Sequence, residues 1–284
     1  MLILKFWNSK GFILVQLFKD FKMQYIIFSD LDGTLLDHET YSFTKARPSL
    51  NLIRKLKIPL IICTSKTRAE IEYYRKKLGL VQPFIAEDGG AIYIPKDYFS
   101  FKFNYTKKSK EYYIIVLGTE YSKLLKVLNL LKKNYPVKAF HDMSIKEIMM
   151  DTGMPYSRAR LARQREYDVV FKILDKKYER SVLKTIKKSG YNYVIGGRYY
   201  HIIGNNNKGK AVKILTKLLK KELGPVKTIG IGDSENDFAM LDCVDIPFLV
   251  MKKNRRYASK KYLKAGGVGP EGWNKAIKEV LGNA

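Results

Sequence analysis

Short apolar runs alternate with amphipathic segments along most of the chain, and this alternation predicts the fold class. Each run ends in polar or glycine-rich residues, and the runs are residues 25–28, 59–63, 84–86 and 226–232. Short apolar runs of this kind indicate strands buried on both faces, as in a parallel sheet. The segments with helical spacing are 45–56, 67–78, 209–223 and 272–281. We therefore expect an α/β protein with a parallel sheet.

The pattern changes between about residue 95 and residue 204. Strand-like and helical segments still alternate there, and two apolar runs flank Gly196–Gly197 as a hairpin. This order predicts an α+β module with an antiparallel sheet, inserted into the first domain. The expected divisions are an N-terminal extension (1–22), a first core segment (23–94), the inserted module (95–204) and a second core segment (205–284).

Residues 1–22 do not share the alternation. They mix apolar residues with lysines, and no small-residue cleavage site follows them. We interpret them as a translation-start extension in front of Met23. The intact mass of the natural protein tests this, and a chain that begins at Met1 would contradict it.

Two aspartates follow the first apolar run. Asp30 and Asp32 stand in D-x-D-G-T-L, and residues i and i+2 of a strand face the same way. Ligands of open α/β sheets bind beyond the carboxyl ends of the strands, so both carboxylates can reach one site. Close carboxylates repel each other unless a cation compensates, and Mg²⁺ prefers such oxygen ligands. The alternative is a simple Asp-Gly turn.

Three further motifs follow in order. They are a hydroxyl residue after the second strand (Thr64), K-G-x-A at a helix start (Lys208) and G-D-x-x-N-D after the last long run (Asp233, Asn236). With D-x-D-G-T-L, they resemble the haloacid dehalogenase (HAD) superfamily. The stretch 86–92 resembles the exit into a type IIB cap, with Asp88 in place of the usual Asn. The resemblance implies a Rossmann-like HAD core with a parallel sheet, plus an inserted α+β cap domain.

The resemblance also implies the chemistry of a phosphotransferase. Asp30 would be the nucleophile that becomes an aspartyl-phosphate, and Asp32 the general acid and base. Thr64 and Lys208 would contact the transferring phosphoryl group; the alternative is that Thr64 or Ser65 is only the N-cap of the next helix. Mg²⁺ would be held by Asp30, Asp233 and the backbone carbonyl of Asp32, and Asn236 would orient the phosphate or the substrate.

Four stretches resemble the mannosyl-3-phosphoglycerate phosphatases in particular, which make a compatible solute of heat-adapted microbes. They are residues 64–71, 161–168, 197–201 and 205–209. The substrate-binding residues that we expect from them are Ser65, Lys66, Arg163, Gln164, Arg165, Glu166, Arg198 and His201. Arg163 and Arg165 offer planar forks for a carboxylate. The alternatives are a solvated helix face for Arg160, Arg163 and Arg165 and a core position for His201. Val169–Phe171 departs from the family pattern.

Composition limits the remaining functions. The net charge of +26 is compatible with nucleic-acid binding, but the lysines are scattered and no nucleic-acid motif holds them, so we do not expect a nucleic-acid partner. The charge also attracts a small anionic sugar phosphate. Two distant cysteines favour a reducing, cytoplasmic setting, and no run is long enough to span a membrane.

Several alternatives remain open from the sequence. They are sucrose-phosphate, phosphoglycolate and glucosyl-3-phosphoglycerate phosphatases, a phosphomannomutase, and a basic nucleic-acid-binding protein with a relict core. The sequence does not determine the oligomeric state.

Overall fold

The computed structural model describes residues 6–8, 11–13, 24–196 and 199–282. Its centre is a five-stranded sheet in which all neighbouring strands run parallel. In sheet order the strands are β15 (Leu263–Val268), β14 (Ile246–Met251), β13 (Val226–Gly232), β3 (Gln24–Ser29) and β4 (Leu60–Ile62). The predicted parallel sheet is confirmed. The apolar pattern predicts that the last strand of this sheet lies near Pro247. The structure has one further strand, β15, which pairs with β14 at the edge of the sheet.

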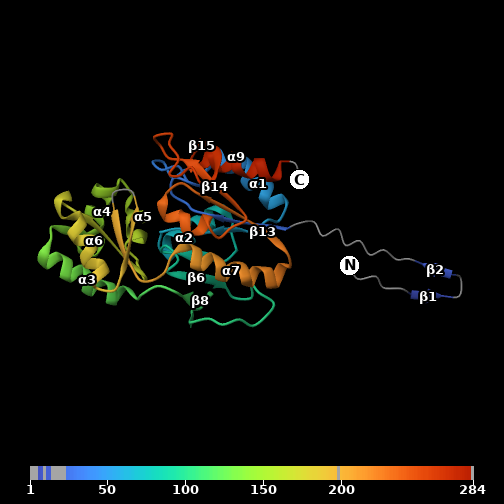
Figure 1. Ribbon diagram of the computed structural model, residues 1–284, viewed down its shortest axis with the longest axis horizontal. Helices are drawn as coiled ribbons and strands as arrows, with labels where there is room; N and C mark the ends of the chain where they lie inside the picture. The colour runs from blue at the N-terminus through green and yellow to red at the C-terminus, as the bar shows by residue number, and fades with distance from the viewer. Residues whose placement is uncertain (1–5, 9–10, 14–23, 197–198, 283–284) are drawn as a thin grey trace.

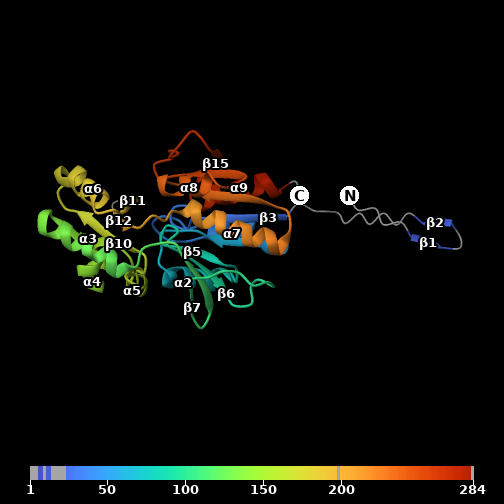
Figure 2. The same ribbon diagram turned by 60° about the horizontal axis from the view of Figure 1, so that its bottom comes forward.

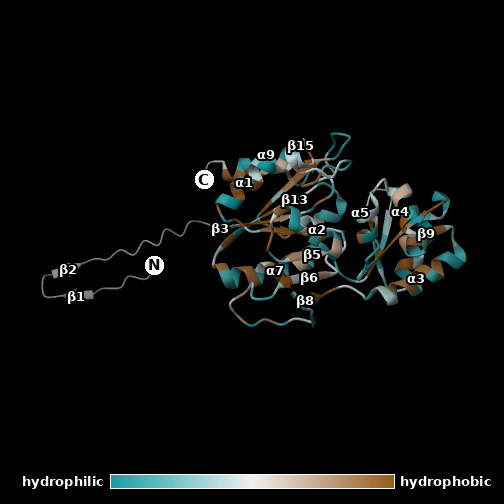
Figure 3. Ribbon diagram, turned by 180° about the vertical axis from the view of Figure 1, so that it is seen from behind, coloured by the Kyte–Doolittle hydropathy of each residue, from teal (hydrophilic) through white to brown (hydrophobic). Residues whose placement is uncertain are grey.

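Helices cover both faces of this sheet (Figure 1). Alternate residues of β3 serve the two faces: Ile27 packs with one set of helices, and Ile26 and Phe28 pack with the other. The first set is α1 (Arg47–Lys55), α2 (Arg68–Leu78) and α9 (Pro270–Leu281), and the second is α7 (Lys208–Leu223) and α8 (Phe238–Leu241). The hydrophobic residues accordingly concentrate on the central strands (Figure 3).

A second, antiparallel sheet continues the first one. Its strands are β5 (Phe84–Ala86), β6 (Ala91–Pro95), β8 (Tyr112–Val116) and β7 (Lys107–Lys108). A parallel bridge between Cys63 and Ile85 joins it to the end of β4. Residues 107–116 therefore lie beside residues 84–95, although the sequence places the two segments in different domains. The predicted domain boundaries stay predictions.

The inserted module is built on a third sheet, which is antiparallel as predicted. Its strands are β11 (Asn192–Gly196), β12 (Tyr199–Ile203), β10 (Asp168–Ile173) and β9 (Val137–Ala139). Helices α3 (Tyr121–Asn134) and α6 (Glu179–Lys188) pack on one face, and α4 (Ile145–Thr152) and α5 (Tyr156–Ala162) on the other (Figure 2). The sequence pattern does not predict α4 or α5. We call residues 118–203 the cap.

The expected N-terminal extension lies mostly outside the described residues. Within it, β1 (Phe6–Asn8) and β2 (Gly11–Ile13) pair antiparallel. Among the described residues, no helix has the length and apolar character needed to cross a membrane.

Candidate active site

The loops after β3, β4 and β13 meet at one edge of the parallel sheet. Asp30 follows β3, and its backbone N–H donates to the carbonyl of Ile231 in β13 at 3.0 Å. Gly33 has a φ of +71°, and a Cβ there would lie 3.0 Å from a carboxylate oxygen of Asp233. The first loop therefore passes directly against the residue that follows β13. This is the edge at which ligands bind in open α/β sheets.

Lys208 is a buried cation at this edge. It is the first residue of α7, and its Nζ lies 2.8 Å from Asp30 Oδ1 and 2.6 Å from Asp237 Oδ1. Burial opposes its charge, but Asp237 and Asp30 hold its pKa well above the ordinary value. Gly209 lets the helix approach closely, because a Cβ there would lie 2.1 Å from the carbonyl oxygen of Ala239. Lys208 is therefore an ammonium group in contact with the expected nucleophile.

Three carboxylates form a compact cluster beside Lys208. Ligand oxygens of Asp30, Asp233 and Asp237 lie within 4.8 Å of one another. Burial and the neighbouring carboxylates raise the pKa of Asp233 to about 8 and that of Asp237 to about 6. Crowded oxygens with this excess of negative charge fit a hard divalent cation such as Mg²⁺. Asp237 is not among the ligands expected from the sequence, although it ends the G-D-x-x-N-D motif.

Asp32 lies on the other side of the loop and contacts a second lysine. Lys66 Nζ lies 2.7 Å from Asp32 Oδ2 and 3.1 Å from Glu70 Oε1. Burial raises the pKa of Asp32, and Lys66 opposes part of this rise. Asp32 Oδ1 and Thr64 Oγ1 are buried and have no hydrogen-bond partner among the described residues. The loop after β4 thus presents a hydroxyl and an ammonium group, and the ammonium is already paired with Asp32.

Asp88 stands between this edge and the cap. Its Oδ1 accepts a hydrogen bond from Asn236 at 3.3 Å and lies 4.0 Å from Lys208 Nζ. Burial raises the pKa of Asp88, and its Oδ2 has no partner in the described part of the protein. Asn236 therefore lies beside the Lys208 cluster, and its expected role with the phosphate or the substrate stays a prediction.

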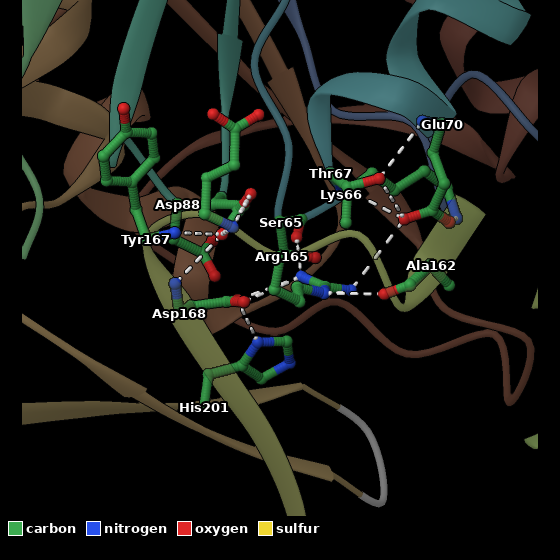
Figure 4. A network of polar contacts seen from close by, with 12 residues as sticks. Ser65, Lys66, Thr67, Glu70, Asp88, Ala162, Arg165, Tyr167, Asp168 and His201 are labelled. Carbon is green, nitrogen blue, oxygen red and sulfur yellow. Dashed lines mark hydrogen bonds and ion pairs between the residues drawn. The ribbon is translucent and has the colours of Figure 1, made fainter. Parts of the chain in front are cut away.

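Arg165 bridges the cap and the loop after β4 (Figure 4). Its Nη1 donates to the backbone carbonyl of Ser65 at 2.7 Å and contacts Asp168 Oδ2 at 3.0 Å. Asp168 in turn lies 2.7 Å from His201 Nδ1, and His201 is buried in strand β12. These contacts are all within the protein, so the expected role of Arg165 and His201 in substrate binding stays a prediction.

Glu87 holds the cap segment that contains these residues. Its carboxylate accepts hydrogen bonds from the backbone N–H groups of Glu166, Tyr167 and Asp168, at distances from 2.7 to 3.1 Å. Glu87 is fully buried and has a φ of +50°, a conformation that non-glycine residues rarely adopt. Sequence reasoning does not single out Glu87 as a site residue, because in the sequence it is only part of a turn.

The other expected substrate residues lie around this bridge. Glu166 pairs with Arg68 at 3.0 Å. Arg163 and Gln164 are exposed, and Arg163 donates to the carbonyl of His141 at 3.4 Å. Arg198 lies outside the described residues. The structure thus brings Asp32, Ser65, Lys66 and Arg165 together near Asp30. The Arg163 side chain instead contacts the backbone of His141.

Comparisons with known proteins identify several proteins that are similar to this chain. A family model described as haloacid dehalogenase-like hydrolase matches residues 27–261. A glucosyl-3-phosphoglycerate/mannosyl-3-phosphoglycerate phosphatase of Methanococcoides burtonii is 45% identical over 267 residues, which are 92% of this chain and 98% of that protein. A mannosyl-3-phosphoglycerate phosphatase of Pyrococcus furiosus is 38% identical over 226 residues, 79% of this chain and 90% of that protein. A solved sugar phosphatase of HAD subclass IIB aligns with a TM-score of 0.63 at 16% identity, over 90% of this chain and 99% of its own.

Proposed function

The chain belongs to the haloacid dehalogenase-like hydrolases, and from this premise we propose that it is a Mg²⁺-dependent phosphatase of mannosyl-3-phosphoglycerate. The products are mannosylglycerate and inorganic phosphate. The observation that carries the chemistry is the pair of aspartates at the end of β3: Asp30 contacts Lys208, and Asp32 contacts Lys66. The substrate follows from the similarity to phosphatases that are named for it.

In this proposal the two aspartates have different roles because their environments differ. Asp30 lies in the carboxylate cluster and attacks the phosphorus in line, which forms an aspartyl-phosphate. Asp32 lies outside that cluster, and burial raises its pKa, which favours the protonated form that a general acid needs. It gives its proton to the leaving oxygen of glycerate and then takes one from the attacking water.

The remaining groups stabilise charge on the phosphoryl oxygens. Lys208 is a buried cation next to Asp30, and the Thr64 hydroxyl is buried without a partner in the described part of the protein, so it is free to donate to the phosphoryl group. Asp30, Asp233 and the backbone carbonyl of Asp32 would hold Mg²⁺, with Asp237 beside them. When bound, Mg²⁺ neutralises negative charge on the phosphate and on Asp30.

The cap residues act on the substrate or on the closure of the site. We assign Arg165 to positioning, because its guanidinium joins the carbonyl of Ser65 to Asp168. Arg163, Gln164, Glu166, Arg198 and His201 remain proposed substrate contacts. Closure of the cap over the site excludes water and selects the substrate.

Glucosyl-3-phosphoglycerate is a second candidate substrate. It is favoured by the Methanococcoides burtonii relative, whose name includes both compounds. The test is phosphate release from the mannosyl and glucosyl compounds, sucrose phosphate and phosphoglycolate, with Mg²⁺ and with excess EDTA. We expect Mg²⁺-dependent release from one or both phosphoglycerate compounds. Phosphate release from sucrose phosphate or phosphoglycolate alone would support the phosphatase chemistry but reject the proposed substrate.

A further inference from the structure

A hollow of about 160 Å³ lies between the loop that follows Asp32 and the cap. Its walls include Tyr41 of this loop, Tyr73, Tyr74 and Lys77 of α2, and Pro155 and Arg158 of the cap. At about 30 Å³ for each liquid water molecule, the hollow has room for about five waters. It therefore suits a group of a few heavy atoms rather than a whole disaccharide.

Two cations line this hollow without a carboxylate partner. The guanidinium carbon of Arg158 lies 4.0 Å from the centre of the Tyr41 ring, and Nη1 of Arg158 donates to the Tyr74 hydroxyl at 3.4 Å. Lys77 lies over the Tyr73 ring, with its Nζ 4.6 Å from the ring centre. Within the described part of the chain, neither Arg158 nor Lys77 makes an ion pair, whereas Lys66, Arg165 and Lys208 each contact a carboxylate. The described lining of the hollow thus includes two cations and no carboxylate.

The hollow is close to the expected general acid. Lys66 Nζ, which contacts Asp32, lies 5.3 Å from the centre of the Tyr41 ring and 5.9 Å from that of Tyr74. Both rings also line the hollow, so Arg158 and Lys66 share the Tyr41 ring as a neighbour. In the proposed function Asp32 protonates the leaving oxygen, and Asp32 is linked to the wall of the hollow through Lys66, which lies beside Tyr41.

Tyr41 is held in a strained backbone conformation. Its φ is +56°, and its backbone N–H donates to the carbonyl of Asp37 at 2.9 Å. The Asp37 carboxylate accepts hydrogen bonds from the backbone N–H groups of Glu39 and Thr40, which fixes the turn. Strain that the surrounding turn maintains is common where a side chain must be presented to a ligand. The turn presents the Tyr41 ring to both Arg158 and Lys66.

We propose that Arg158, with Lys77 and the rings of Tyr41 and Tyr74, binds the carboxylate of the glycerate leaving group. This subsite rests on the proposed function, which supplies a leaving group that carries a carboxylate close to the reacting oxygen. A guanidinium matches a carboxylate with two parallel hydrogen bonds, and aromatic faces pack against carbon-bound hydrogens. Arg158 belongs to the cap and Tyr41 to the core, so the bound carboxylate draws the two together.

The test compares Arg158→Met with two matched variants. Arg158→Lys keeps the charge, and Arg160→Met removes an exposed arginine of the same helix that does not line the hollow. The measurement is kcat/KM for mannosyl-3-phosphoglycerate and for p-nitrophenyl phosphate, which has no carboxylate. Arg158→Met is expected to lose about tenfold or more on the first substrate and less than about twofold on the second, with Arg158→Lys in between and Arg160→Met unchanged. Equal losses on both substrates, or no loss, would overturn the subsite.

A second measurement separates this subsite from the proposed function. D-glycerate is expected to inhibit p-nitrophenyl phosphate hydrolysis by the wild type, glycerol is not, and Arg158→Met is expected to raise the inhibition constant about tenfold. If the wild type does not hydrolyse mannosyl-3-phosphoglycerate but glycerate inhibition depends on Arg158, the proposed substrate is rejected and the carboxylate subsite is supported. If the wild type hydrolyses that compound and glycerate inhibition is the same in Arg158→Met, the carboxylate subsite is rejected and the proposed function is kept. Lys77→Met, at an exposed position, gives the same readout should Arg158→Met not fold.

Discussion

The ammonium group of Lys66 lies 2.7 Å from a carboxylate oxygen of Asp32. Lys66 is almost fully buried and also contacts Glu70, so its ammonium group already forms ion pairs within the protein before any substrate binds. Burial opposes its charge, but Asp32 and Glu70 hold its pKa above the ordinary value. We therefore assign Lys66 to the positioning and proton affinity of Asp32 rather than to the substrate alone.

Replacing Lys66 with Met is expected to move the pH optimum of kcat upward and to lower kcat by about 10–100-fold. The lysine lowers the pKa of Asp32, so its loss raises that pKa and shifts both the acid and the base function of Asp32 to higher pH. Lys66→Arg keeps the charge and should keep most of the pH profile. An unchanged profile in Lys66→Met would contradict the assignment.

Thr64→Val separates catalysis from stability. Thr64 Oγ1 is buried without a partner among the described residues, so its removal breaks no hydrogen bond there and should leave the melting temperature unchanged or higher. A donor to the phosphoryl oxygens is lost, and kcat should fall by about 10²-fold. A variant that loses stability and keeps kcat would show that the hydroxyl serves the fold.

Glu87→Gln tests the connection between the core and the cap. Oε2 of this carboxylate accepts hydrogen bonds from three successive backbone N–H groups, and Oε1 accepts a further one from Glu166. Gln replaces one of the two oxygens with an N–H₂ group, which would then face a backbone N–H that it cannot accept from. We expect a loss of about 2–4 kcal/mol in the free energy of unfolding, measured by denaturant titration. Glu166→Gln is the matched control: its partly exposed pair with Arg68 should contribute less than about 1 kcal/mol. Equal losses would refute the anchoring role.

The carboxylate cluster predicts how stability depends on pH. Folding raises the pKa of Asp233 to about 8 and of Asp237 to about 6, from an ordinary value of 3.8. The folded protein therefore binds these protons more tightly than the unfolded chain, and stability falls as the pH rises from about 4 to about 8. With EDTA present, the melting temperature should decline across this range.

Mg²⁺ should oppose that decline. At a concentration of about 100 times its Kd, a ligand of the folded state adds about 2.7 kcal/mol, so the melting temperature at pH 8 should rise by several degrees. Asp233→Asn should weaken both the pH dependence and the effect of Mg²⁺. If the melting temperature of the wild type depends on neither pH nor Mg²⁺, this would argue against a cation site at the carboxylate cluster.

The sequence identifies the residues whose position follows from local rules. Asp30, Asp32, Thr64 and Asp233 each follow a buried strand, and the ends of parallel strands meet at one edge, so short-range patterns are sufficient to bring them together. The parallel sheet and the antiparallel cap sheet follow from the same alternation. The helices α4 and α5 do not follow from it.

Contacts that depend on three-dimensional packing do not follow from such patterns. The contact of Glu87 with the backbone of Tyr167 joins residues 80 positions apart, and no spacing rule connects a turn to a distant backbone. Arg165 and Arg158 look alike in the sequence. Only the structure shows that Arg165 is paired with Asp168, whereas Arg158 lines a hollow whose described lining includes no acid.

The most direct test of the account is the position of the phosphoryl group in an acid-quenched reaction. Wild-type protein mixed with mannosyl-3-phosphoglycerate and Mg²⁺, quenched early and digested, should carry one phosphoryl group on the peptide that contains Asp30. Asp30→Asn should show neither this label nor turnover, because an amide is a poor nucleophile. Turnover by Asp30→Asn, or a phosphoryl group on another residue, would contradict the assignment of Asp30 as the nucleophile.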